Sequence, residues 1–415
     1  MKKIKVIPKF FNQLLISKLC FCFVLFSFNV LAIEFKGDVY NETGTQKARD
    51  DSPLNPANRL NLNEEEFYTR AGISAKGNYK DAKGYVKFEG IYAPVDFNRA
   101  SIETSSKKDK TYLKAAYIDF QGDDWSVVFG KKFVSWGSGI FFYPLDVINY
   151  NRDPLRPLEE AEGNSFLRLS SFYFEYFTPE LYVVTIPERP PYQVLKASDV
   201  QLVPRISFNV NSFGGFFFAK WRGNQKPSWG ANFNYVKTIF QSVDISTYAE
   251  GLLRSEREKF TIDRAENADH TIFPAFLVGL RSKINFSTVR WVDALQINVE
   301  YYYDRKNWSS KEFNQFLSNY ELYYNDYVLF SNSQSYRYIG IFLESFMKKN
   351  LRVGFSLVTN NDDQSSLLIP EISYSFSNQN ARMGIRSMFF SGDRGSEFGS
   401  YPVSNQLLGY GELSF

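Results

Sequence analysis

Side chains that bind metals or act as nucleophiles are scarce in this sequence. The 415 residues include two cysteines, Cys20 and Cys22, and one histidine, His270. Zinc sites need Cys or His ligands, and nucleophilic catalysis needs a base placed beside the nucleophile. Glycine-rich phosphate-binding loops are also missing. The composition therefore predicts a protein that is not an enzyme and that holds no catalytic residue, metal or cofactor.

Long hydrophobic runs are missing as well. After residue 32, no stretch approaches the roughly 20 apolar residues that a membrane-spanning helix needs. No linker tract and no change of composition divides the remaining chain. We therefore expect residues 33–415 to form one domain without spanning helices.

The N-terminal segment 1–32 has the three-part layout of a cleaved secretory signal peptide. An apolar run at 19–28 and small or modest residues ending at Ala32 follow a basic part that contains Lys2, Lys3, Lys5, Lys9 and Lys18. Cleavage after Ala32 would remove both cysteines, and thiol chemistry with them. It would also remove five of the positive charges behind the formal net charge of +3, so no nucleic-acid partner is expected. A retained membrane anchor is the alternative.

The sequence does contain a repeated strand pattern. Segments of about ten residues, rich in Phe, Tyr and Val, alternate apolar with polar side chains, which is typical of a transmembrane β-barrel. Eighteen such segments can be counted, or sixteen if one hairpin is merged. Long connections such as 137–163 and 305–334 alternate with tight ones such as 122–124 and 178–179. The pattern predicts an all-β, transmembrane, antiparallel up-and-down β-barrel with long extracellular loops, short periplasmic turns and both termini in the periplasm.

The chain ends on an alternating strand. In Gln406–Phe415, one face of that strand carries Leu407, Gly409, Gly411, Leu413 and Phe415. The pattern resembles the C-terminal signal of Gram-negative outer-membrane β-barrels, whose last strand ends in Phe. The resemblance implies a cell outer-membrane location, contact with lipid and lipopolysaccharide, and recognition of the strand ending at Phe415 by the barrel-assembly machinery. It also implies that this strand pairs with the one starting near Glu34 to close the barrel.

Each predicted strand carries one apolar face, and a ring of eighteen strands encloses a lumen too wide to fill with side chains. The apolar faces must then meet lipid, and the polar faces must line water. The charged side chains expected to face the lumen are Lys87, Glu89, Arg205, Lys220, Arg222, Glu250, Arg281, Lys283, Glu300, Arg352, Glu371, Arg382 and Arg386. Either they select solutes, or they only pair with one another. The grouping of the basic members favours anionic or hydroxylated solutes.

Aromatic residues at strand ends suit the two interfaces of a membrane. The expected members of these girdles include Tyr112, Trp125, Trp136, Trp221 and Trp229. We therefore expect these side chains on the outer surface of the barrel.

The most distinctive local sequence is Gly130–Asn149, GKKFVSWGSGIFFYPLDVIN, at the end of the fifth predicted strand. It resembles the "WG-x-G…P-x-D-V-I-N" signature of porin-like barrels, including those of the alginate-export type. In porins the third external loop folds into the lumen, and 137–163 is the third long connection here. The resemblance implies a constriction lined by Asp146, Arg152, Asp153, Arg156, Glu159 and Glu160. The alternative is an ordered cap on the rim of the barrel.

Connection 305–334 is a second candidate gate. Ser309 and Glu312 have the spacing of a capping box, which begins a helix. An aromatic stripe at helical spacing follows and contains Phe313, Phe316, Leu317, Tyr320 and Tyr324. The stripe packs inside the barrel mouth, docks on a partner or only holds the loop down.

The leading hypothesis is a porin-like channel for passive or facilitated diffusion of small polar solutes, narrowed by the loop 137–163. One alternative is a surface adhesin or receptor barrel with a plugged lumen, acting through loops 43–65, 254–273 and 305–334. A third hypothesis, less favoured, is an outer-membrane hydrolase that uses His270. The sequence leaves open the identity of the solute and whether the protein forms a homo-oligomer.

Overall fold

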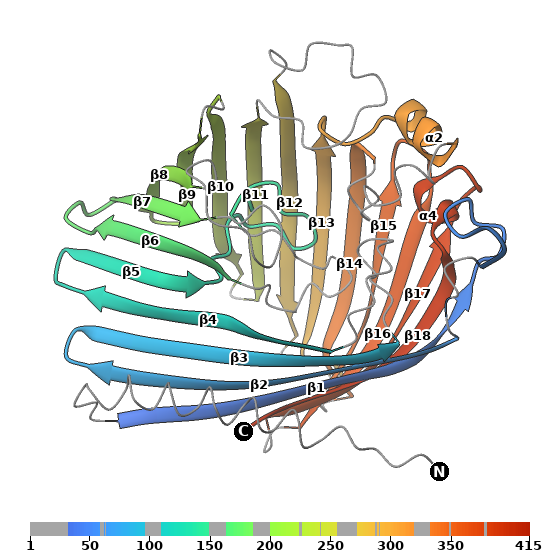
Figure 1. The fold of residues 1–415 in the computed structure, drawn as a ribbon, viewed down its shortest axis with the longest axis horizontal. Helices are drawn as coiled ribbons and strands as arrows, with labels where there is room; N and C mark the ends of the chain where they lie inside the picture. Colours follow the sequence, from blue (N-terminus) through green and yellow to red (C-terminus); the bar gives the residue numbers. More distant parts are fainter. Residues whose placement is uncertain are drawn as a thin grey trace.

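The computed structural model describes residues 32–58, 62, 64–95, 109–148, 163–185, 200–223, 226–240, 242–254, 272–286, 289, 291–318, 333–347, 350–376 and 380–415. Within these ranges the chain forms one closed ring of eighteen strands (Figure 1). The part of the chain described here contains no helix that is long and apolar enough to cross a membrane.

The strands follow one another round the ring in chain order. Each pairs antiparallel with the strands before and after it, and the last strand pairs with the first. They are β1 (Ala32–Ala48), β2 (Glu65–Tyr79), β3 (Ala82–Val95), β4 (Asp109–Gln121), β5 (Trp125–Lys132), β6 (Asn164–Ser171), β7 (Phe177–Thr185), β8 (Val200–Val210), β9 (Phe213–Arg222), β10 (Ser228–Ile239), β11 (Val243–Arg254), β12 (Phe273–Asn285), β13 (Ala294–Asp304), β14 (Ser335–Phe346), β15 (Leu351–Asn360), β16 (Ser366–Phe376), β17 (Ala381–Ser391) and β18 (Val403–Ser414). The predicted all-β, up-and-down barrel of eighteen strands is therefore confirmed.

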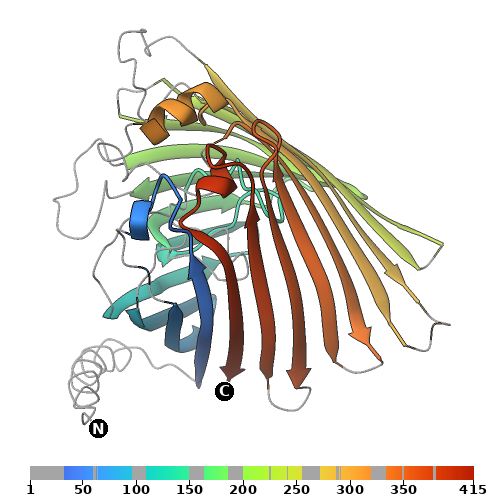
Figure 2. The same ribbon diagram turned by 90° about the vertical axis from the view of Figure 1, so that its right-hand side faces the viewer.

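The closing seam lies between β1 and β18 (Figure 2). Its register runs from Asp38 opposite Ser414 to Ala48 opposite Val403. Beyond the last strand residue, the backbone N–H of Phe415 donates to the Gly37 carbonyl at 2.9 Å. A Cβ at Gly37 would lie 2.4 Å from the Phe415 ring, so a larger residue there would make this exposed ring turn away from the seam. The predicted pairing of the terminal strand with the first strand is confirmed.

Alternation of side chains gives the ring two different faces. In β13, Val299 points outward and is 39% exposed, whereas the next residue, Glu300, points inward and is fully buried. Large apolar side chains on the outward face stay exposed in the same way in many strands, among them Phe129, Ile206, Phe276, Phe355 and Ile385. The outer surface is therefore apolar, as a barrel that sits in lipid requires.

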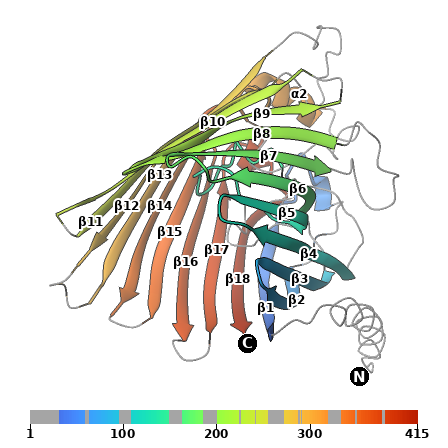
Figure 3. The same ribbon diagram turned by 90° about the vertical axis from the view of Figure 1, so that its left-hand side faces the viewer.

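Because the number of strands is even, the first strand begins and the last strand ends at the same rim of the barrel, here called the terminal rim (Figure 3). Connections at this rim are short: 80–81, 122–124, 172–176, 211–212, 240–242, 286–293, 347–350 and 377–380. Most connections at the opposite rim are longer: 49–64, 96–108, 133–163, 186–199, 223–227, 255–272, 305–334, 361–365 and 392–402. Two of them, 223–227 and 361–365, are as short as a turn.

One hairpin differs from its predicted position. The sequence pattern placed strands at 164–177 and 180–187, with the turn at 178–179, but β6 ends at Ser171 and the turn spans 172–176. The turn is a run of exposed aromatic side chains, with Tyr173 75% exposed. Aromatic residues favour membrane interfaces as well as strands, and the pattern alone did not separate the two.

The prediction that Trp136 and Tyr112 belong to the interfacial girdles is wrong. Trp136 is fully buried, and Tyr112 donates to Glu89 on the inner face. Trp125, Trp221 and Trp229 are exposed on the outer face, as expected. The error at Trp136 arises because β5 already ends at Lys132, so the chain leaves the wall before it reaches the tryptophan.

The core of the molecule lies inside the barrel. Side chains from the connections at the opposite rim pack with inward-facing strand residues in two apolar clusters. The larger cluster joins Leu54, Phe141, Phe313 and Phe398, which come from four different connections. Folded-in connections therefore fill part of the lumen that the strands alone would leave open.

Candidate functional site: an inner loop and the charged wall

The segment 133–148, here called the inner loop, leaves β5 and runs inside the barrel (Figure 1, teal trace). Trp136 is its first anchor. The indole packs edge-on against three inward-facing rings, with centroid distances of 5.2 Å to Tyr182, 5.9 Å to Phe216 and 5.0 Å to Phe218. These rings come from β7 and β9, so the loop starts its path on that side of the wall.

Other atoms approach the backbone so closely at Gly137 and Gly139 that no side chain fits at either position. Gly137 has a φ of +92°, a conformation that side chains rarely adopt, and a Cβ there would lie 2.5 Å from Glu250 Oε1. A Cβ at Gly139 would lie 1.9 Å from the Phe142 carbonyl oxygen. The W-G-x-G motif is therefore one buried ring followed by a backbone that only glycine allows.

Glu250 of β11 holds the first half of the turn that follows. Its Oε1 accepts the backbone N–H of Ser138 and, at 3.0 Å, that of Gly139. Asn232 of β10 supports the contact by donating to the Ser138 hydroxyl at 3.1 Å.

Glu300 of β13 holds the second half. Its two oxygens accept the backbone N–H groups of Ile140, of Phe141 at 3.0 Å and of Phe142 at 3.2 Å. The hydroxyl of Tyr248 donates to the same carboxylate at 2.6 Å. Five successive backbone donors of the inner loop therefore end on two carboxylates of the barrel wall; we call this arrangement the carboxylate clamp.

Two phenylalanines then fix the loop against the next strands. Phe142 stacks on Tyr302 with ring centroids 4.7 Å apart and an interplanar angle of 8°. Phe141 stacks on Tyr338 at 5.0 Å. The inner loop therefore follows the wall from β7 to β14 and leaves the other side of the lumen to different residues.

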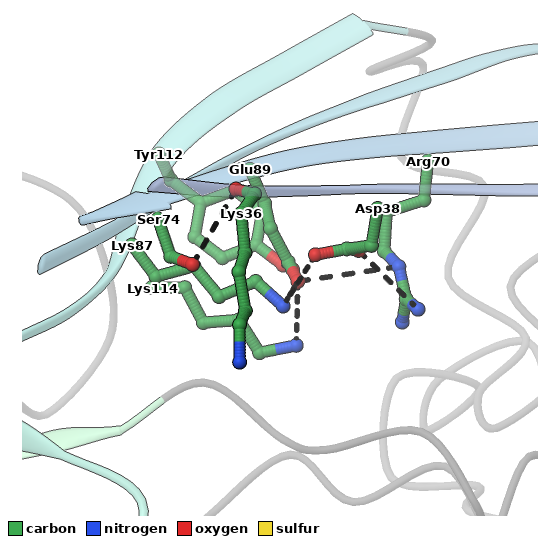
Figure 4. A network of polar contacts seen from close by, with 8 residues as sticks. All are labelled: Lys36, Asp38, Arg70, Ser74, Lys87, Glu89, Tyr112 and Lys114. Carbon is green, nitrogen blue, oxygen red and sulfur yellow. Dashed lines mark hydrogen bonds and ion pairs between the residues drawn. The ribbon is translucent and has the colours of Figure 1, made fainter. Parts of the chain in front are cut away.

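The inward faces of β1–β4 form that other side, here called the charged wall (Figure 4). Glu89 lies at its centre, within 2.7 Å of the Lys114 ammonium and 3.3 Å of the Lys87 ammonium, and it accepts the Tyr112 hydroxyl at 2.8 Å. Lys87 also pairs with Asp38 at 2.9 Å. Sequence alternation did not select Lys114, because a bulge in β4 opposite Lys87 and Phe88 shifts the register there.

Arg70 and Lys36 complete the charged wall. The Arg70 guanidinium lies 4.0 Å from both carboxylates, Asp38 and Glu89. Lys36 pairs with Glu34 at 2.9 Å near the terminal rim, where both side chains are mostly exposed. The inward faces of β1 and β2 also carry the buried carboxylates Glu42 and Glu66, so cations and carboxylates are mixed along the charged wall.

A second ion cluster lies across the closing seam. Glu371 of β16 pairs with Arg382 at 3.1 Å and Arg386 at 3.0 Å. Tyr410 of β18 donates to the same carboxylate at 2.8 Å. These predicted lumen residues therefore form one contact group.

The other predicted lumen residues lie apart from these groups. Arg205 pairs with Glu180 at 2.5 Å and lies over the Trp136 ring, and Arg352 pairs with Glu344 at 3.0 Å. Lys220 and Arg222 are half-buried on the inward face of β9. Arg281 and Lys283 are exposed on the inward face of β12. An effect of these charges on solutes remains a prediction.

The predicted constriction residues are placed only in part. Asp146 lies in the inner loop, with its backbone N–H donating to the Tyr143 carbonyl at 3.1 Å. The remaining five, Arg152, Asp153, Arg156, Glu159 and Glu160, lie outside the described residues, as does His270. In the described part of the chain, no group of three or more His, Cys, Asp or Glu side chains is placed to hold a metal ion.

The second predicted gate begins as expected. Helix α2 (Ser310–Ser318) starts at a capping box, in which the Ser309 N–H donates to Glu312 at 2.8 Å and the Glu312 N–H donates to the Ser309 hydroxyl at 3.4 Å. Phe313 and Phe316 are buried in the inner apolar cluster. Leu317 packs against that cluster, whereas Tyr320 and Tyr324 lie outside the described residues.

Solved structures with the same fold are bacterial outer-membrane porins. A BenF-like porin from Pseudomonas fluorescens superposes with a TM-score of 0.61 and 9% identity over 93% of this chain and 100% of its own. Pseudomonas aeruginosa OccK2 (OpdF), solved in complex with glucuronate, gives 0.59 and 9% over 93% and 98%. Acinetobacter baumannii OccAB1 gives 0.57 and 10% over 92% and 96%. No protein-family model matches the sequence, and no curated protein matches it significantly. The chain therefore has the fold of a porin-type outer-membrane barrel.

Proposed function

We propose that the protein is a porin-like channel that lets small polar solutes diffuse across the outer membrane of a Gram-negative bacterium. The observation that carries the proposal is the division of the inner surface: the inner loop is held against the wall from β7 to β14, whereas the ion pairs of the charged wall lie on β1–β4. A barrel with an apolar outside and a charged inside separates lipid from a polar path. No covalent step is required.

The proposal places the terminal rim in the periplasm. Short turns at that rim and longer connections at the opposite rim match the usual orientation of bacterial barrels. Both termini would then be periplasmic, and the outer surface would contact lipid and, toward the opposite rim, lipopolysaccharide. The strand ending at Phe415 would be the part that the barrel-assembly machinery recognises. A homo-oligomer is compatible with this orientation.

The solute is proposed from the charges that face it. The charged wall presents lysine and arginine side chains among its carboxylates, and Arg382 and Arg386 add two further cations across the seam. Such a surface attracts anionic or hydroxylated solutes and holds them only weakly, because most charges are already paired. The glucuronate bound by OccK2 belongs to that chemical class.

The inner loop is proposed as the narrow part of the channel. Residues 137–148 take up space inside the ring, and Asp146 lies among them. The remaining part of connection 137–163, with Arg152, Asp153, Arg156, Glu159 and Glu160, would complete the constriction.

Planar-bilayer recording of the purified protein tests the proposal. We expect stable open steps and a selectivity for anions over cations that weakens as salt screens the wall charges. A protein that produces no steps, yet binds cells or surface ligands through its opposite rim, would instead be an adhesin or receptor barrel. If the protein hydrolyses lipid and the activity depends on His270, it would be an enzyme rather than a channel or an adhesin.

A further inference from the structure

We propose that Glu250 and Glu300 are positioning residues that hold the inner loop against the wall and keep the passage clear. The inference rests on the proposed channel function. It assigns these two carboxylates a task different from the solute contact that their inward direction predicts. Their partner is a segment of the chain itself, residues 138–142.

The first argument is the way in which the two charges are compensated. The side chains of Glu250 and Glu300 are buried, with 3% and 0% of each residue exposed. Among the described residues neither carboxylate makes an ion pair; their partners are N–H and O–H donors. A buried charge without a counter-ion is costly unless several donors surround it. The clamp supplies donors, mainly from the backbone, to both oxygens of Glu300 and to Oε1 of Glu250, whereas Oε2 of Glu250 accepts no hydrogen bond from the described residues.

The second argument is that the backbone N–H groups of the inner loop need hydrogen-bond acceptors. Residues 133–148 belong to no helix or strand, so their backbone N–H groups have no regular partners. Buried backbone donors must nevertheless be satisfied. Residues 138–142 point five of them toward the clamp. The carboxylates thus replace the neighbouring strand that this segment lacks.

The third argument is the position of the clamp between two apolar anchors. Trp136 seats the loop on β7 and β9, and Phe141 and Phe142 seat it on β13 and β14. Gly137 and Gly139 lie between the anchors and make the backbone there easy to bend. Without the clamp, the stretch between the anchors loses its polar contacts and moves across the lumen.

Single-channel recording of Glu250→Gln, Glu300→Gln and the double variant tests the inference. Glutamine at 300 keeps the size of the side chain but only one of the two accepting oxygens, so part of the backbone donors lose their partner. Glutamine at 250 keeps one oxygen for both N–H groups and removes the negative charge that strengthens these bonds. We expect frequent brief blockades at an unchanged full-open conductance, and most of them in the double variant. The matched control is Glu175→Gln, which neutralises an exposed carboxylate in the turn 172–176 away from the loop.

A cross-linking rescue separates positioning from a general loss of structure. Ser138 Oγ and Asn232 Nδ2 are 3.1 Å apart, so a short, reducible bifunctional thiol reagent can join cysteines at both positions and tether the loop to β10 without the carboxylates. The chain's own cysteines, Cys20 and Cys22, fall within the predicted signal peptide. In the double variant, the cross-linked Ser138→Cys and Asn232→Cys pair should suppress the blockades, and a reducing agent that cleaves the link should restore them; blockades that persist after cross-linking would contradict the positioning role.

The possible results separate the positioning role of Glu250 and Glu300 from the proposed channel function. A silent wild-type protein contradicts the channel itself, whatever the variants do. A conducting wild type together with equally quiet Glu250→Gln, Glu300→Gln and double variants leaves the channel standing and overturns the clamp. If the glutamine variants fail to fold, Tyr248→Phe removes only one donor to Glu300 and should still add blockades; an unchanged record would then refute the clamp.

Discussion

Two regions of the inner surface use the same residue types in different ways. On β11 and β13, Glu250 and Glu300 accept hydrogen bonds from backbone amides of the inner loop. On β1–β4, Glu89 and Asp38 are neutralised by Lys87, Lys114 and Arg70. The first region fixes a segment of the chain, and the second joins neighbouring strands through ion pairs in which the Lys87 side chain stays 14% exposed. An inward carboxylate therefore does not by itself indicate contact with a solute. The groups that it binds show whether it fixes a loop or belongs to a charged surface.

The largest expected effect comes from removing the central carboxylate of the charged wall. Glu89→Leu leaves the buried Lys114 ammonium without its ion pair, and breaking a buried pair in this way costs roughly 3–5 kcal/mol of unfolding free energy. Urea denaturation of the folded barrel, followed by gel mobility, measures it. Adding Lys114→Met should recover most of the loss, because both charges are then gone. If the double variant is as unstable as Glu89→Leu, the loss of stability does not come from the unpaired Lys114 ammonium.

A smaller loss is expected from the equivalent change in the loop-bearing region. Glu300→Leu removes the acceptor of three backbone N–H groups and of the Tyr248 hydroxyl but strands no cation. Because the loop can move off the wall and expose these donors to water, we expect a net cost close to that of one unsatisfied group, about 1–3 kcal/mol. The same denaturation assay compares it with Glu89→Leu. The comparison between the two regions fails if Glu300→Leu is the more destabilising of the two.

Charge reversal at Lys87 should change ion selectivity, in addition to the stability lost because the new carboxylate lies beside Asp38 and Glu89. The Lys87 side chain is 14% exposed, so Lys87→Glu places a negative charge at the surface of the lumen beside Asp38. The reversal potential under a salt gradient should move toward cation selectivity, and less so at high salt. Arg337→Glu is a matched control, since Arg337 lies on β14 beside Tyr336, on the alternate face. A shift of the same size in both variants would contradict a solute path along the charged wall.

The smallest effect is expected at the exposed pair near the terminal rim. Glu34 and Lys36 lie 2.9 Å apart, but more than half of each side chain is exposed, and such pairs add little because water and salt screen them. Glu34→Gln should leave the denaturation midpoint and the conductance unchanged. A measurable loss of stability would mean that the charged wall extends further toward the terminal rim than its buried members indicate.

The sequence predicts the ring well because its signals are local and repeated. Alternation within each strand defines the inward face, so residues such as Arg382 and Arg386 are placed on it without any structure. Capping chemistry defines the start of α2 in the same way, through Ser309 and Glu312. The W-G-x-G motif indicates a special loop, although not where that loop lies.

The contacts of the site depend on long-range pairing, which alternation does not report. Glu300 meets residues about 160 positions earlier in the chain, at 140–142. Trp136 was placed on the outer surface because the end of β5 could not be located from the pattern. Lys114 was not selected because a bulge changes the local register. Each error occurs where the chain departs from a regular strand.

Cysteine modification during channel recording tests the central claim most directly, because it asks which face of the wall meets the solute path. Lys87→Cys places a thiol on the charged wall, and Phe129→Cys places one on the exposed outer face of β5. We predict that a water-soluble, charged thiol reagent lowers the current through Lys87→Cys in a single step and leaves Phe129→Cys unchanged. A current through Lys87→Cys that does not change, although mass spectrometry shows the thiol fully modified, would contradict a passage along the charged wall.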